Sequence, residues 1–592
     1  VKTFERPRQV RRLVRSITRI HPEVRVIVVD DSREPRPVAG AELVALPYNS
    51  GISAGRNTAL AMVDTPYAVF LDDDFVFDRR TRINAPLAWM EKHPDVDVLG
   101  GLVVNLPDWS TGDYRNAPLF PGASPPVVPI GSEIGGLEVF AKVPAGKRID
   151  AKRAIDAAKA AFPAWSQTLP AQRQGLFLKA AEILEKKKMD IVEILAEETG
   201  CTFGFAMFQT MFTPGLLREA AAQVHAAEGE IMPSNLPGAF NMALRQPVGV
   251  VAGIAPWNAP LILSLRSICM PIAYGNTAVL KPSTESAAGG GTGIAEVFDE
   301  AGFPEGVLNL VTNGPGGRGA VGDEFIENPA VRRINLTGSS TVGRKLAEKA
   351  GRYLKREAME LGGQNPMLIL KDANIDTAVN AAAFGGFLHQ GQICMSTRRV
   401  IVIKTVAAQF TEKFVAKVAA FKTGDPKEHD TIIGPIINQQ QLEQVKKSVE
   451  DALKDGATLL CGGKVEGPCF QPTVLGNVKP GTAFACEETF GPVVSVIEVE
   501  SDEEALSVAN DTPYGLSAAV FTADLAKGMA IARQIESGIV HINDQTVHDE
   551  PQVPFGGMKA SGWGRFGGRA ALEEFTELRW VSAQLTPREY PF

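Results

Sequence analysis

Apolar runs that end in acidic residues recur near the N-terminus of the chain. The run Val24–Val29 is continuous and predicts a buried strand, and Tyr67–Leu71 predicts a second strand that ends at Asp72 and Asp74. A helix is predicted over Gly55–Met62, between the two strands. Alternating strands and helices favour a parallel sheet, and the strand-end carboxylates then lie at its carboxyl edge, where open α/β sheets bind nucleotides.

The same alternation of apolar strands and amphipathic helices returns further along the chain. A helix is predicted over Ala151–Ala161, a strand over Val248–Gly253 and a helix over Leu261–Met270. The apolar run Thr277–Leu280 predicts another strand, and Ile334–Ser339 predicts a strand that turns directly into a helix. The whole chain is therefore expected to be an α/β protein, with a Rossmann-like domain in this second part.

Composition divides the chain into two segments. Up to residue 130 there are 14 Arg and 2 Lys, whereas the remainder has 19 Arg and 25 Lys. Basic and acidic residues balance at 16 each in the first segment, so the net charge of −8 comes from the second (44 − 52). The run Gly122–Pro129 is rich in Gly and Pro and is expected to be a linker.

Composition also restricts the function classes. Hydrophobic residues make up 45% of the 592 residues and the net charge is negative, which argues against nucleic-acid binding. The apolar stretches are too short to span a membrane, and Lys2–Arg15 lacks the apolar centre of a signal peptide. Six cysteines do not form a disulfide framework, so a cytoplasmic location is expected.

Cys394 is the first candidate for chemistry. It lies in the run Gly391–Ser396 and follows Glu360 by 34 residues (394 − 360). A thiol and a carboxylate on separate glycine-flanked loops suit covalent catalysis with a water-activating base. A lone Cys is more often a small buried hydrophobe, so this interpretation depends on its companions.

Three companions follow predicted strands. Asn258 stands between two prolines after the strand Val248–Gly253, and its amide can donate to a developing oxyanion. Lys281 follows the apolar run Thr277–Leu280, where a cation can meet a nucleotide. Ser339 opens the helix after Ile334, and the free N–H groups at this position suit a pyrophosphate.

In this order, and with the later runs Glu487–Val493 and Pro554–Gly562, these motifs closely resemble the aldehyde dehydrogenase superfamily over residues 137 to 592. The resemblance implies a dinucleotide domain over 137–365, a catalytic domain over 366–565 and an oligomerisation segment over 566–592. A hairpin near Gly229–Arg245 and the strand Thr576–Ala583 would cross between subunits of a homodimer or homotetramer.

The resemblance also assigns roles. Cys394 would be the nucleophile, Glu360 the base for deacylation, and Asn258 the oxyanion donor together with the Cys394 N–H. An aldehyde would become a carboxylic acid through a thiohemiacetal and a thioester, with NAD or NADP as hydride acceptor. No metal is required, and no His/Cys cluster with zinc-type spacing stands out. The remaining cofactor residues would be Lys281 and Glu488 at the riboses, Ser339 and Gly338 at a phosphate, Phe490 and Trp257 near the nicotinamide ribose, and Thr284 near the adenine ribose.

Within the superfamily the runs around Cys394, His548 and Trp563 look most like the aromatic aldehyde dehydrogenases, which act on benzaldehyde, vanillin and salicylaldehyde. Arg266 falls eight residues (266 − 258) after Asn258, at a position that lines the substrate tunnel in the family. It would suit a hydroxyl or carboxylate on an aryl ring. The alternative is an Arg that pairs with an acid on a partly exposed helix. Further pocket candidates are Leu263, Ile393, Met395 and His548, each of which is alternatively a core residue.

The choice between NAD and NADP depends on the adenine ribose site. Thr284 stands where the family often carries Glu, and Glu285 follows it. A carboxylate repels the 2′-phosphate of NADP, whereas Thr does not. NAD is favoured because Glu285 can turn toward the ribose, and NADP stays open.

Residues 1 to 130 resemble the donor half of a family 2 glycosyltransferase of the GT-A fold. By that resemblance Asp31 would face a uracil-like base, and Asp72 and Asp74 would hold Mg²⁺ or Mn²⁺ against a nucleotide-sugar. The acceptor half that follows in such transferases is missing here, because the second segment begins at its place. A nucleotide-sugar-binding or transferase function therefore stays as the alternative to aldehyde oxidation, alone or in a bifunctional fusion.

Overall fold

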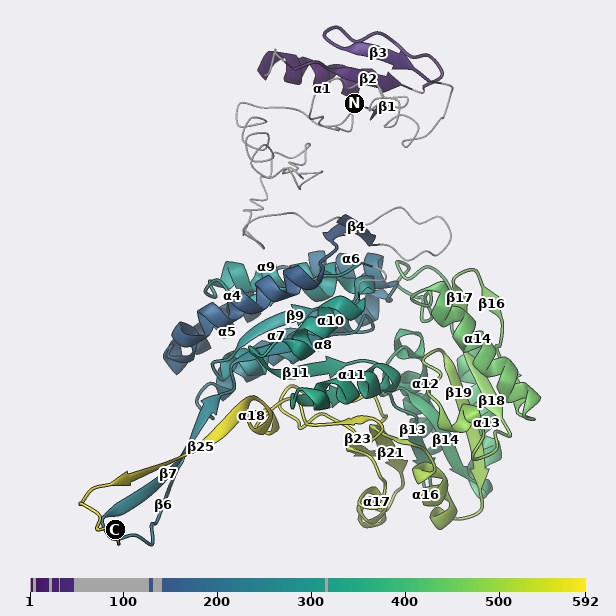
Figure 1. Cartoon of the computed structure of the whole chain (residues 1–592). Coiled ribbons are helices and arrows are strands. Elements are labelled where there is room, and N and C mark those ends of the chain that lie inside the picture. The colour runs from purple at the N-terminus through teal and green to yellow at the C-terminus, as the bar shows by residue number, and fades with distance from the viewer. Residues whose placement is uncertain are drawn as a thin grey trace. The chain divides into compact units, whose positions relative to one another are not determined.

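The computed structural model describes residues 2–3, 7–20, 24–30, 32–46, 127–130, 141–314 and 318–592. The chain divides into two compact units, Val1–Asp113 and Tyr114–Phe592, each of which is described by itself (Figure 1). Among the described residues, the helices are either too short or too polar for a membrane span. All six cysteines, which lie in the described part of the second unit, are free.

The first unit contains a small parallel sheet with the order β1-β2-β3. Its elements are β1 (Lys2–Thr3), α1 (Pro7–Ile20), β2 (Ile27–Asp30) and β3 (Glu42–Ala45). Buried side chains of α1, including Leu13 and Ile17, form one cluster with Val28 of β2. The strand predicted over Val24–Val29 is thus present, shifted toward its acidic end. The predicted helix Gly55–Met62, the strand Tyr67–Leu71 and the metal candidates Asp72 and Asp74 lie outside the described residues, as does Asp31.

The second unit begins with an antiparallel pair, β4 (Val127–Ile130) and β5 (Ala141–Pro144). The prediction of a linker over Gly122–Pro129 is therefore wrong at its end. The apolar residues around Pro129 pair with β5, and proline is tolerated because a two-stranded ribbon consists only of edge strands.

A helical layer follows, made of α4 (Arg148–Ser166), α5 (Pro170–Lys186), α6 (Lys188–Thr199) and α7 (Phe203–Gln223). The helix predicted over Ala151–Ala161 is longer than expected and runs through Pro163. Its last turn is retained because Trp165 is only 1% exposed and its indole N–H donates to the carbonyl of Ile272 at 3.1 Å. Packing of one aromatic side chain thus outweighs the helix-breaking tendency of Pro163.

The first large sheet of this unit has the strand order β10-β9-β8-β11-β12-β24. Its strands are β8 (Val250–Ile254), β9 (Thr277–Lys281), β10 (Leu308–Leu310), β11 (Val331–Thr337), β12 (Arg356–Glu360) and β24 (Gly562–Trp563). All neighbours are parallel except β24, which runs antiparallel to β12. The helical segments between these strands are α8 (Pro260–Ala273), η1 (Thr284–Ser286), η2 (Ala288–Thr292), α9 (Gly293–Ala301), α10 (Arg318–Glu327) and α11 (Ser340–Arg352).

One strand prediction and one helix prediction for this part of the chain are wrong at their ends. The strand predicted from Val248 begins at Val250, because Gly249 has a φ of +129° and its N–H is bound by the Asn276 side chain at 3.0 Å. The helix predicted over Leu261–Met270 runs from Pro260 to Ala273, and every residue in it is buried. The helix is enclosed because α7 and the sheet both pack against it, so the partly exposed helix in the alternative for Arg266 is not observed.

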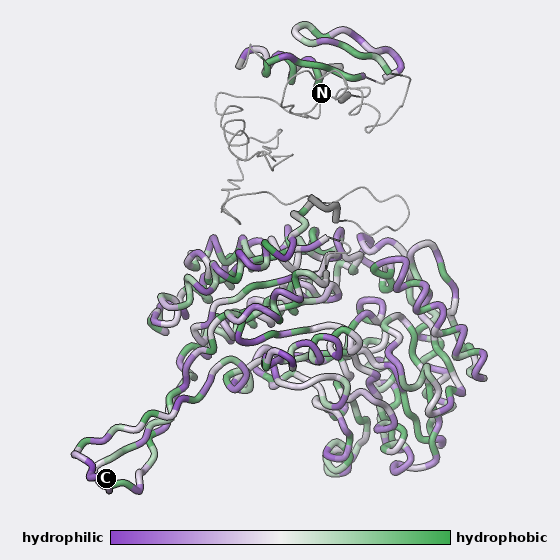
Figure 2. The backbone as a smooth tube through the Cα atoms, viewed as in Figure 1, coloured by the Kyte–Doolittle hydropathy of each residue, from purple (hydrophilic) through white to green (hydrophobic). Residues whose placement is uncertain are grey.

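The second large sheet has the order β15-β18-β19-β14-β13-β21-β22. Its strands are rich in Val and Ile, as their hydrophobic colouring in Figure 2 shows, and their side chains contribute to two hydrophobic clusters. The strands are β13 (Asn365–Ile369), β14 (Thr397–Ile403), β15 (Thr458–Cys461), β18 (Thr473–Gly476), β19 (Val493–Val499), β21 (Ser517–Phe521) and β22 (Ile539–Ile542). The helical segments around them are α12 (Ile375–Phe387), η3 (Leu388–Gly391), α13 (Lys404–Ala419), α14 (Gln439–Lys454), α15 (Ala483–Cys486), α16 (Asp502–Asn510) and α17 (Leu525–Ala532).

A third sheet projects from the body of this unit and carries the C-terminus at its far end (Figure 1). It consists of β6 (Glu230–Met232), β7 (Ala239–Pro247) and β25 (Thr576–Gln584), and α18 (Ala570–Phe575) leads into it. β25 pairs with β7 along its full length, from Thr576 opposite Pro247 to Gln584 opposite Ala239. The remaining described strands are the short β16 (Val465–Glu466), β17 (Cys469–Phe470), β20 (Tyr514–Gly515) and β23 (Met558–Lys559).

Candidate active site

Cys394 lies on a tight turn between η3 and β14. Three consecutive residues before it adopt positive φ angles, His389 at 50°, Gln390 at 55° and Gly391 at 64°. At Gly391 a side chain would collide with the main-chain carbonyl of Gly491, so glycine is required there for space as well as for conformation. This strained segment presents the partly buried thiol at the junction of the two large sheets.

The side chains of Asn365 and Thr546 hold the turn that carries Cys394 through hydrogen bonds to its main chain. The amide nitrogen of Asn365, at the start of β13, donates to the main-chain carbonyls of Cys394 and Ser396, both at 2.8 Å. The Thr546 hydroxyl donates to the carbonyl of Met395 at 2.6 Å. The sequence analysis assigned no role to Asn365 or Thr546. The position of Asn365 only five residues after Glu360 was the one available signal.

Asn258 reaches the same turn from the other large sheet. It follows β8, is 4% exposed, and its side-chain nitrogen donates to the carbonyl of Gln392 at 3.0 Å. An amide nitrogen carries two hydrogens, so this bond orients the group and leaves one hydrogen for another acceptor. Asn258 therefore lies beside the turn that carries Cys394.

Glu360 ends β12, opposite Thr337 of β11 and Gly562 of β24. Its side chain is buried, and among the described residues neither carboxylate oxygen has a hydrogen-bond partner. Burial raises the pKa of Glu360 to about 8, with a smaller lowering by Arg266 and a raising by Asp549. A carboxyl group in this state changes charge near neutral pH, as a general base must.

The electrostatics of Cys394 follow from these neighbours. Burial raises the pKa of the Cys394 thiol well above its usual value, and the carboxylates of Glu360 and Glu488 raise it further, while Arg266 lowers it. The electrostatic influence of Glu360 on Cys394 indicates that the two groups lie near one another.

A pocket of about 290 Å³ lies beside the carboxyl ends of β8 and β9. Trp257, Lys281, Thr284 and Glu285 line one wall, and Gln441 at the start of α14 lines the other. Lys281 is 8% exposed and brings a positive charge to the pocket. Such a crevice at strand ends is where open α/β sheets hold a dinucleotide, and a cation beside aromatic and polar groups fits a nucleotide.

The other cofactor candidates lie outside the lining of this pocket. The ring of Phe490 meets that of Trp257 edge to face at 5.5 Å. A carboxylate oxygen of Glu488 accepts from the N–H of Gly363 at 3.1 Å, and burial raises its pKa to about 7. Ser339 is exposed and caps α11, where its hydroxyl accepts from the Val342 N–H at 3.3 Å, and Gly338 stands next to it. These residues fit the groups of a bound NAD(P).

A model of the aldehyde dehydrogenase family matches residues 135–581. The chain belongs to the aldehyde dehydrogenase family. A vanillin dehydrogenase of Pseudomonas fluorescens is 46% identical over 454 residues, which cover 77% of this chain and 94% of the relative. A benzaldehyde dehydrogenase of Bacillus subtilis is 42% identical and covers 75% and 91%, respectively.

A solved structure agrees with the sequence comparisons. The salicylaldehyde dehydrogenase of Pseudomonas putida G7, complexed with salicylaldehyde, matches with a TM-score of 0.77 at 40% identity, covering 79% of this chain and 96% of that one. The expected fold class is confirmed, and the protein is an NAD(P)-dependent aldehyde dehydrogenase. A model of the glycosyl transferase family 2 matches residues 1–123.

In this aldehyde dehydrogenase, Arg266 forms a buried ion pair with Asp549. Arg266 donates to a carboxylate oxygen of Asp549 at 2.6 Å, and the two side chains are 4% and 8% exposed. The guanidinium carbon lies 4.4 Å from the centre of the Phe555 ring. Burial raises the pKa of Asp549, while Arg266 lowers it. The alternative of an acid-paired Arg is thus realised, although in the interior rather than on an exposed helix.

The apolar pocket candidates of the aldehyde dehydrogenase belong to one hydrophobic cluster. Leu263, Ile393 and Met395 are 6%, 5% and 7% exposed, and partly buried Cys394 packs against the same cluster. Residues of α7, among them Met207 and Phe212, complete it on another side. Cys394 therefore borders an apolar environment that suits a hydrophobic substrate.

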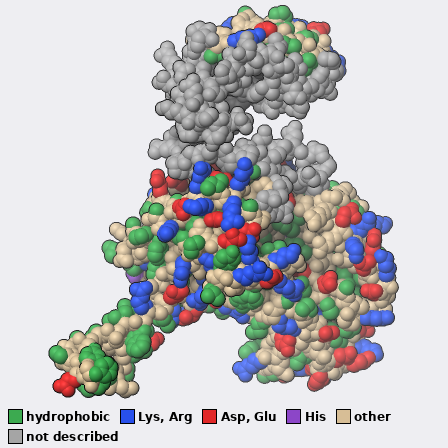
Figure 3. All heavy atoms as spheres, viewed as in Figure 1, with side chains coloured by type: hydrophobic (Ala, Val, Ile, Leu, Met, Phe, Trp, Pro, Cys, Tyr) green, Lys and Arg blue, Asp and Glu red, His purple; other side chains and the backbone are tan. Residues whose placement is uncertain are grey.

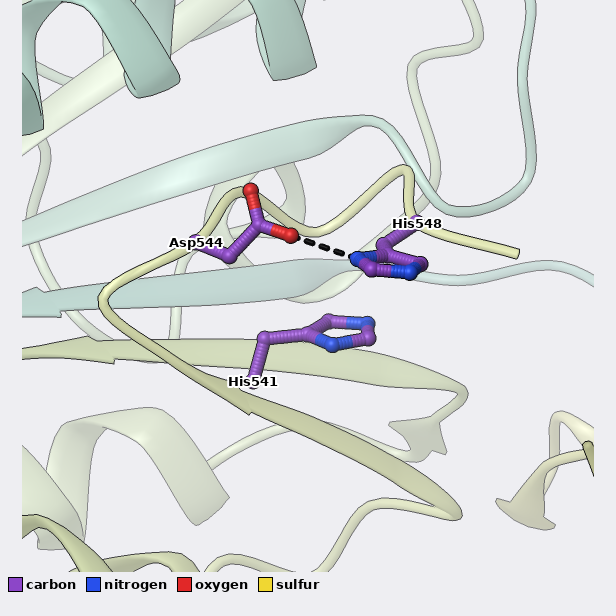
Figure 4. Close-up of side chains that lie close together, drawn as sticks. All are labelled: His541, Asp544 and His548. Carbon is purple, nitrogen blue, oxygen red and sulfur yellow. Dashed lines mark hydrogen bonds and ion pairs between the residues drawn. The ribbon is translucent and has the colours of Figure 1, made fainter. Parts of the chain in front are cut away.

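His548 lies in a different setting from these apolar residues. Its ring is 40% exposed, and its nitrogens lie 2.5 Å from Asp544 and 3.2 Å from Glu550. The ring also stacks on His541 with centroids 5.0 Å apart (Figure 4). The expectation that no zinc-type cluster stands out needs correction, because His541, Asp544 and His548 offer ligand atoms within 4.8 Å of one another. The sequence spacing concealed this group, since it joins a strand residue to a loop.

Proposed function

We propose that this aldehyde dehydrogenase oxidises an aromatic aldehyde to the carboxylic acid at Cys394, with Glu360 as the base for deacylation. The observation that carries the proposal is the convergence of a thiol, an oriented amide and a buried carboxylate from three separate segments. Asn258 and the main-chain N–H of Cys394 supply the oxyanion donors. The names of the relatives, which act on vanillin, benzaldehyde and salicylaldehyde, support the aromatic class.

The first half of the reaction forms a covalent intermediate. The Cys394 sulfur attacks the aldehyde carbon, its proton leaves to solvent, and the carbonyl oxygen becomes an oxyanion. Asn258 would donate its second amide hydrogen to this oxyanion, since the first is bound by the carbonyl of Gln392. Removing one such donor typically costs about 100-fold to 1000-fold in rate. NAD(P), when bound, accepts the hydride that converts the thiohemiacetal to a thioester.

The second half of the reaction releases the acid. The unpaired carboxylate of Glu360 takes a proton from water, the hydroxide attacks the thioester carbon, and the C–S bond breaks to return Cys394. A carboxyl group with a pKa raised to about 8 is a stronger base toward water than an ordinary Glu, and it titrates near neutral pH. Burial of Glu360 therefore serves the deacylation step directly.

We further propose NAD as the preferred cofactor, with NADP as the alternative. Lys281 and Glu488 would bind the ribose hydroxyls, Ser339 and Gly338 a phosphate, and Phe490 with Trp257 the nicotinamide ribose region. Thr284 and Glu285 both line the pocket at the candidate adenine ribose position. The carboxylate of Glu285 favours the cofactor that lacks a 2′-phosphate.

Single-turnover and steady-state kinetics test the assignments. Cys394→Ala is expected to abolish aldehyde oxidation and to keep NAD binding, because it removes the covalent step and no nucleotide contact. Glu360→Gln is expected to give a burst of reduced cofactor and then to stall as the thioester. A Glu360→Gln enzyme with unchanged steady-state turnover would contradict the role of the base, and a panel of aromatic and aliphatic aldehydes tests the substrate class.

The projecting sheet supports a homo-oligomer, either a dimer or a tetramer. Hydrophobic side chains gather on it (Figure 3), and Ile231 and Trp580 are 79% and 74% exposed. Large exposed apolar groups on an extended sheet mark an interface. A second copy of this chain is the proposed partner, with β7 and β25 in the contact.

The family match over residues 1–123 supports a second, separate proposal. The first unit would bind a nucleotide-sugar or nucleoside diphosphate with Mg²⁺ or Mn²⁺ at Asp72 and Asp74 but would not transfer the sugar. Titration calorimetry with UDP and Mn²⁺ tests this on the full chain, with Asp72→Asn as the variant that weakens binding. Sugar transfer above background would contradict the absence of activity, and no heat of binding would contradict the proposed site.

A further inference from the structure

The group His541, Asp544 and His548 lies outside the proposed chemistry of aldehyde oxidation. His541 belongs to β22, which pairs with β21 at Ala519, and Asp544 and His548 lie on the loop that follows. Each residue offers one ligand atom, and these atoms all lie within 4.8 Å of one another. Figure 4 shows the two rings facing one another, with the Asp544 carboxylate directed at His548.

The loop that carries this group is anchored at both ends. The side chain of Asn543 accepts from the Thr522 N–H at 3.0 Å, and the Ser517 hydroxyl donates to the carbonyl of Thr546 at 2.7 Å. The Asp544 carboxylate accepts from the N–H of Gln545 at 2.8 Å, which orients it. The backbone around Asp544 is therefore held in place, while the side chains of Asp544 and His548 stay 45% and 40% exposed and open to solvent.

The contacts of His548 match those of a metal-binding histidine. Its Nε2 lies 3.2 Å from a carboxylate oxygen of Glu550, while its Nδ1 faces Asp544 at 2.5 Å. Ligating histidines commonly donate their second ring N–H to a carboxylate, which fixes the tautomer and presents the other nitrogen to the ion. His541 adds a second imidazole, and its Nε2 is buried without a hydrogen-bond partner among the described residues.

We propose that His541, Asp544 and His548 form a Zn²⁺ site, with Glu550 as the orienting carboxylate. Two imidazole nitrogens and one carboxylate oxygen are a donor set that Zn²⁺ accepts, with water as the fourth ligand. Bond lengths of about 2.0–2.2 Å in a tetrahedral site place ligand atoms roughly 3.3–3.6 Å apart. The ligand atoms, which lie within 4.8 Å of one another, must therefore shift by about an ångström when the ion binds.

An ion at this site would act on the substrate pocket through the chain. His548 precedes Asp549, whose carboxylate pairs with Arg266 in the interior. Binding would fix the segment between Asp544 and Glu550 and so limit the movements of the Arg266 partner. A cation bound at the surface would thus be linked through the chain to the wall of the candidate aldehyde pocket. Metal binding itself does not depend on the proposed substrate.

Metal titration of the intact, untagged protein tests the proposal. The Cys394→Ser background removes the reactive thiol, and calorimetry with Zn²⁺ is expected to show one equivalent bound. His541→Gln, His548→Gln and Asp544→Asn should each weaken this binding at least tenfold, and Glu550→Gln should weaken it by about tenfold. His225→Gln is the matched control, since it removes an exposed histidine from another part of the chain.

The visible spectrum of the Co²⁺-loaded protein identifies the ligands. Nitrogen and oxygen ligands are expected to give ligand-field bands without a thiolate-to-cobalt charge-transfer band. Binding that survives His541→Gln and His548→Gln, a thiolate band, or no binding at all would each overturn the site. Melting curves show whether a histidine variant folds, and Asp544→Asn, which alters a half-exposed side chain, carries the test if one does not.

Discussion

The side-chain amide of Asn365 donates to the main-chain carbonyl of Cys394 at 2.8 Å. The same amide group donates to Ser396, and its oxygen accepts from the Ser517 N–H at 3.0 Å. One buried side chain therefore ties the nucleophile turn to β21, which no motif in the sequence indicates. Its neighbour Gly363 allows this approach, because a Cβ there would collide with the Cys394 carbonyl.

Asn365→Ala is expected to lower kcat by roughly tenfold or more, since leaving buried carbonyls unpaired costs about 1–3 kcal/mol and loosens the turn. Cofactor affinity should change little. Asn276→Ala is the matched control, because Asn276 also donates to two buried carbonyls, at Pro271 and Phe575. It should lower stability without a comparable loss in kcat. Equal effects of both variants on kcat would show that Asn365 has only a structural role.

The steady-state rate is expected to rise with pH through about 8, because Glu360 must lose its proton to serve as base and its pKa lies there. Below this pH the carboxyl is neutral and deacylation slows. The measurement is kcat as a function of pH for the wild type and for Glu360→Gln. If kcat of the Glu360→Gln enzyme rose with pH in the same way, a group other than Glu360 would cause the increase.

The same pKa predicts how stability depends on pH. The folded protein holds a proton on Glu360 that the unfolded chain loses above the ordinary Glu pKa of 4.5, so stability falls as pH rises between that pKa and about 8. Glu360→Gln does not titrate, and its Tm should therefore gain on that of the wild type as pH is raised from about 5 to about 9. Parallel Tm curves for the two proteins would contradict a raised pKa.

Variants of the ion pair between Arg266 and Asp549 test whether Arg266 contacts the substrate or only supports the fold. Replacing both residues in Arg266→Leu/Asp549→Leu removes the pair without leaving a buried charge, which Arg266→Leu alone would do. If Arg266 contacts a ring substituent, kcat/KM should fall for hydroxylated benzaldehydes by roughly 10-fold to 100-fold more than for benzaldehyde. Equal losses on all aldehydes would mean that the pair only supports the fold.

Glu285 is expected to set the cofactor preference. Glu285→Gln removes the negative charge at nearly constant size, and the ratio of kcat/KM for NADP to that for NAD should rise by about tenfold, since like charges near a surface repel by about 1 kcal/mol or more. Thr284→Glu should shift the ratio the other way. An unchanged ratio in Glu285→Gln would place the selectivity elsewhere in the pocket.

Trp580→Glu is expected to shift the protein toward a smaller species. The side chain is 74% exposed on β25, and a charge in an apolar contact opposes association. Light scattering after size-exclusion chromatography measures the mass of each protein. Lys479→Glu, which changes a charge on an unrelated loop, is the control, and an unchanged mass for Trp580→Glu would exclude β25 from the contact.

Some strands and turns of this protein were predictable because they depend on residues that are close together in the sequence. The strand Thr277–Lys281 and the strand-to-helix turn before Ser339 were expected within three residues of their observed ends, because hydrophobic periodicity and capping act over a few residues. The positions of Cys394, Glu360 and Asn258 in glycine and proline contexts were readable for the same reason. Predictions failed at Val127–Ile130 and at Pro163, where partners distant in the chain decided the conformation.

The sequence by itself therefore determined which groups are candidates for the chemistry and in which local backbone they stand. Only the tertiary structure decided the pKa values and the partners of these groups, because desolvation and pairing depend on neighbours that are remote along the chain. Burial raises the pKa of Glu360 to about 8, and Asp549 reaches Arg266 across 283 residues. The grouping of His541 with Asp544 and His548 arises likewise from the turn that follows β22 rather than from a recognisable spacing.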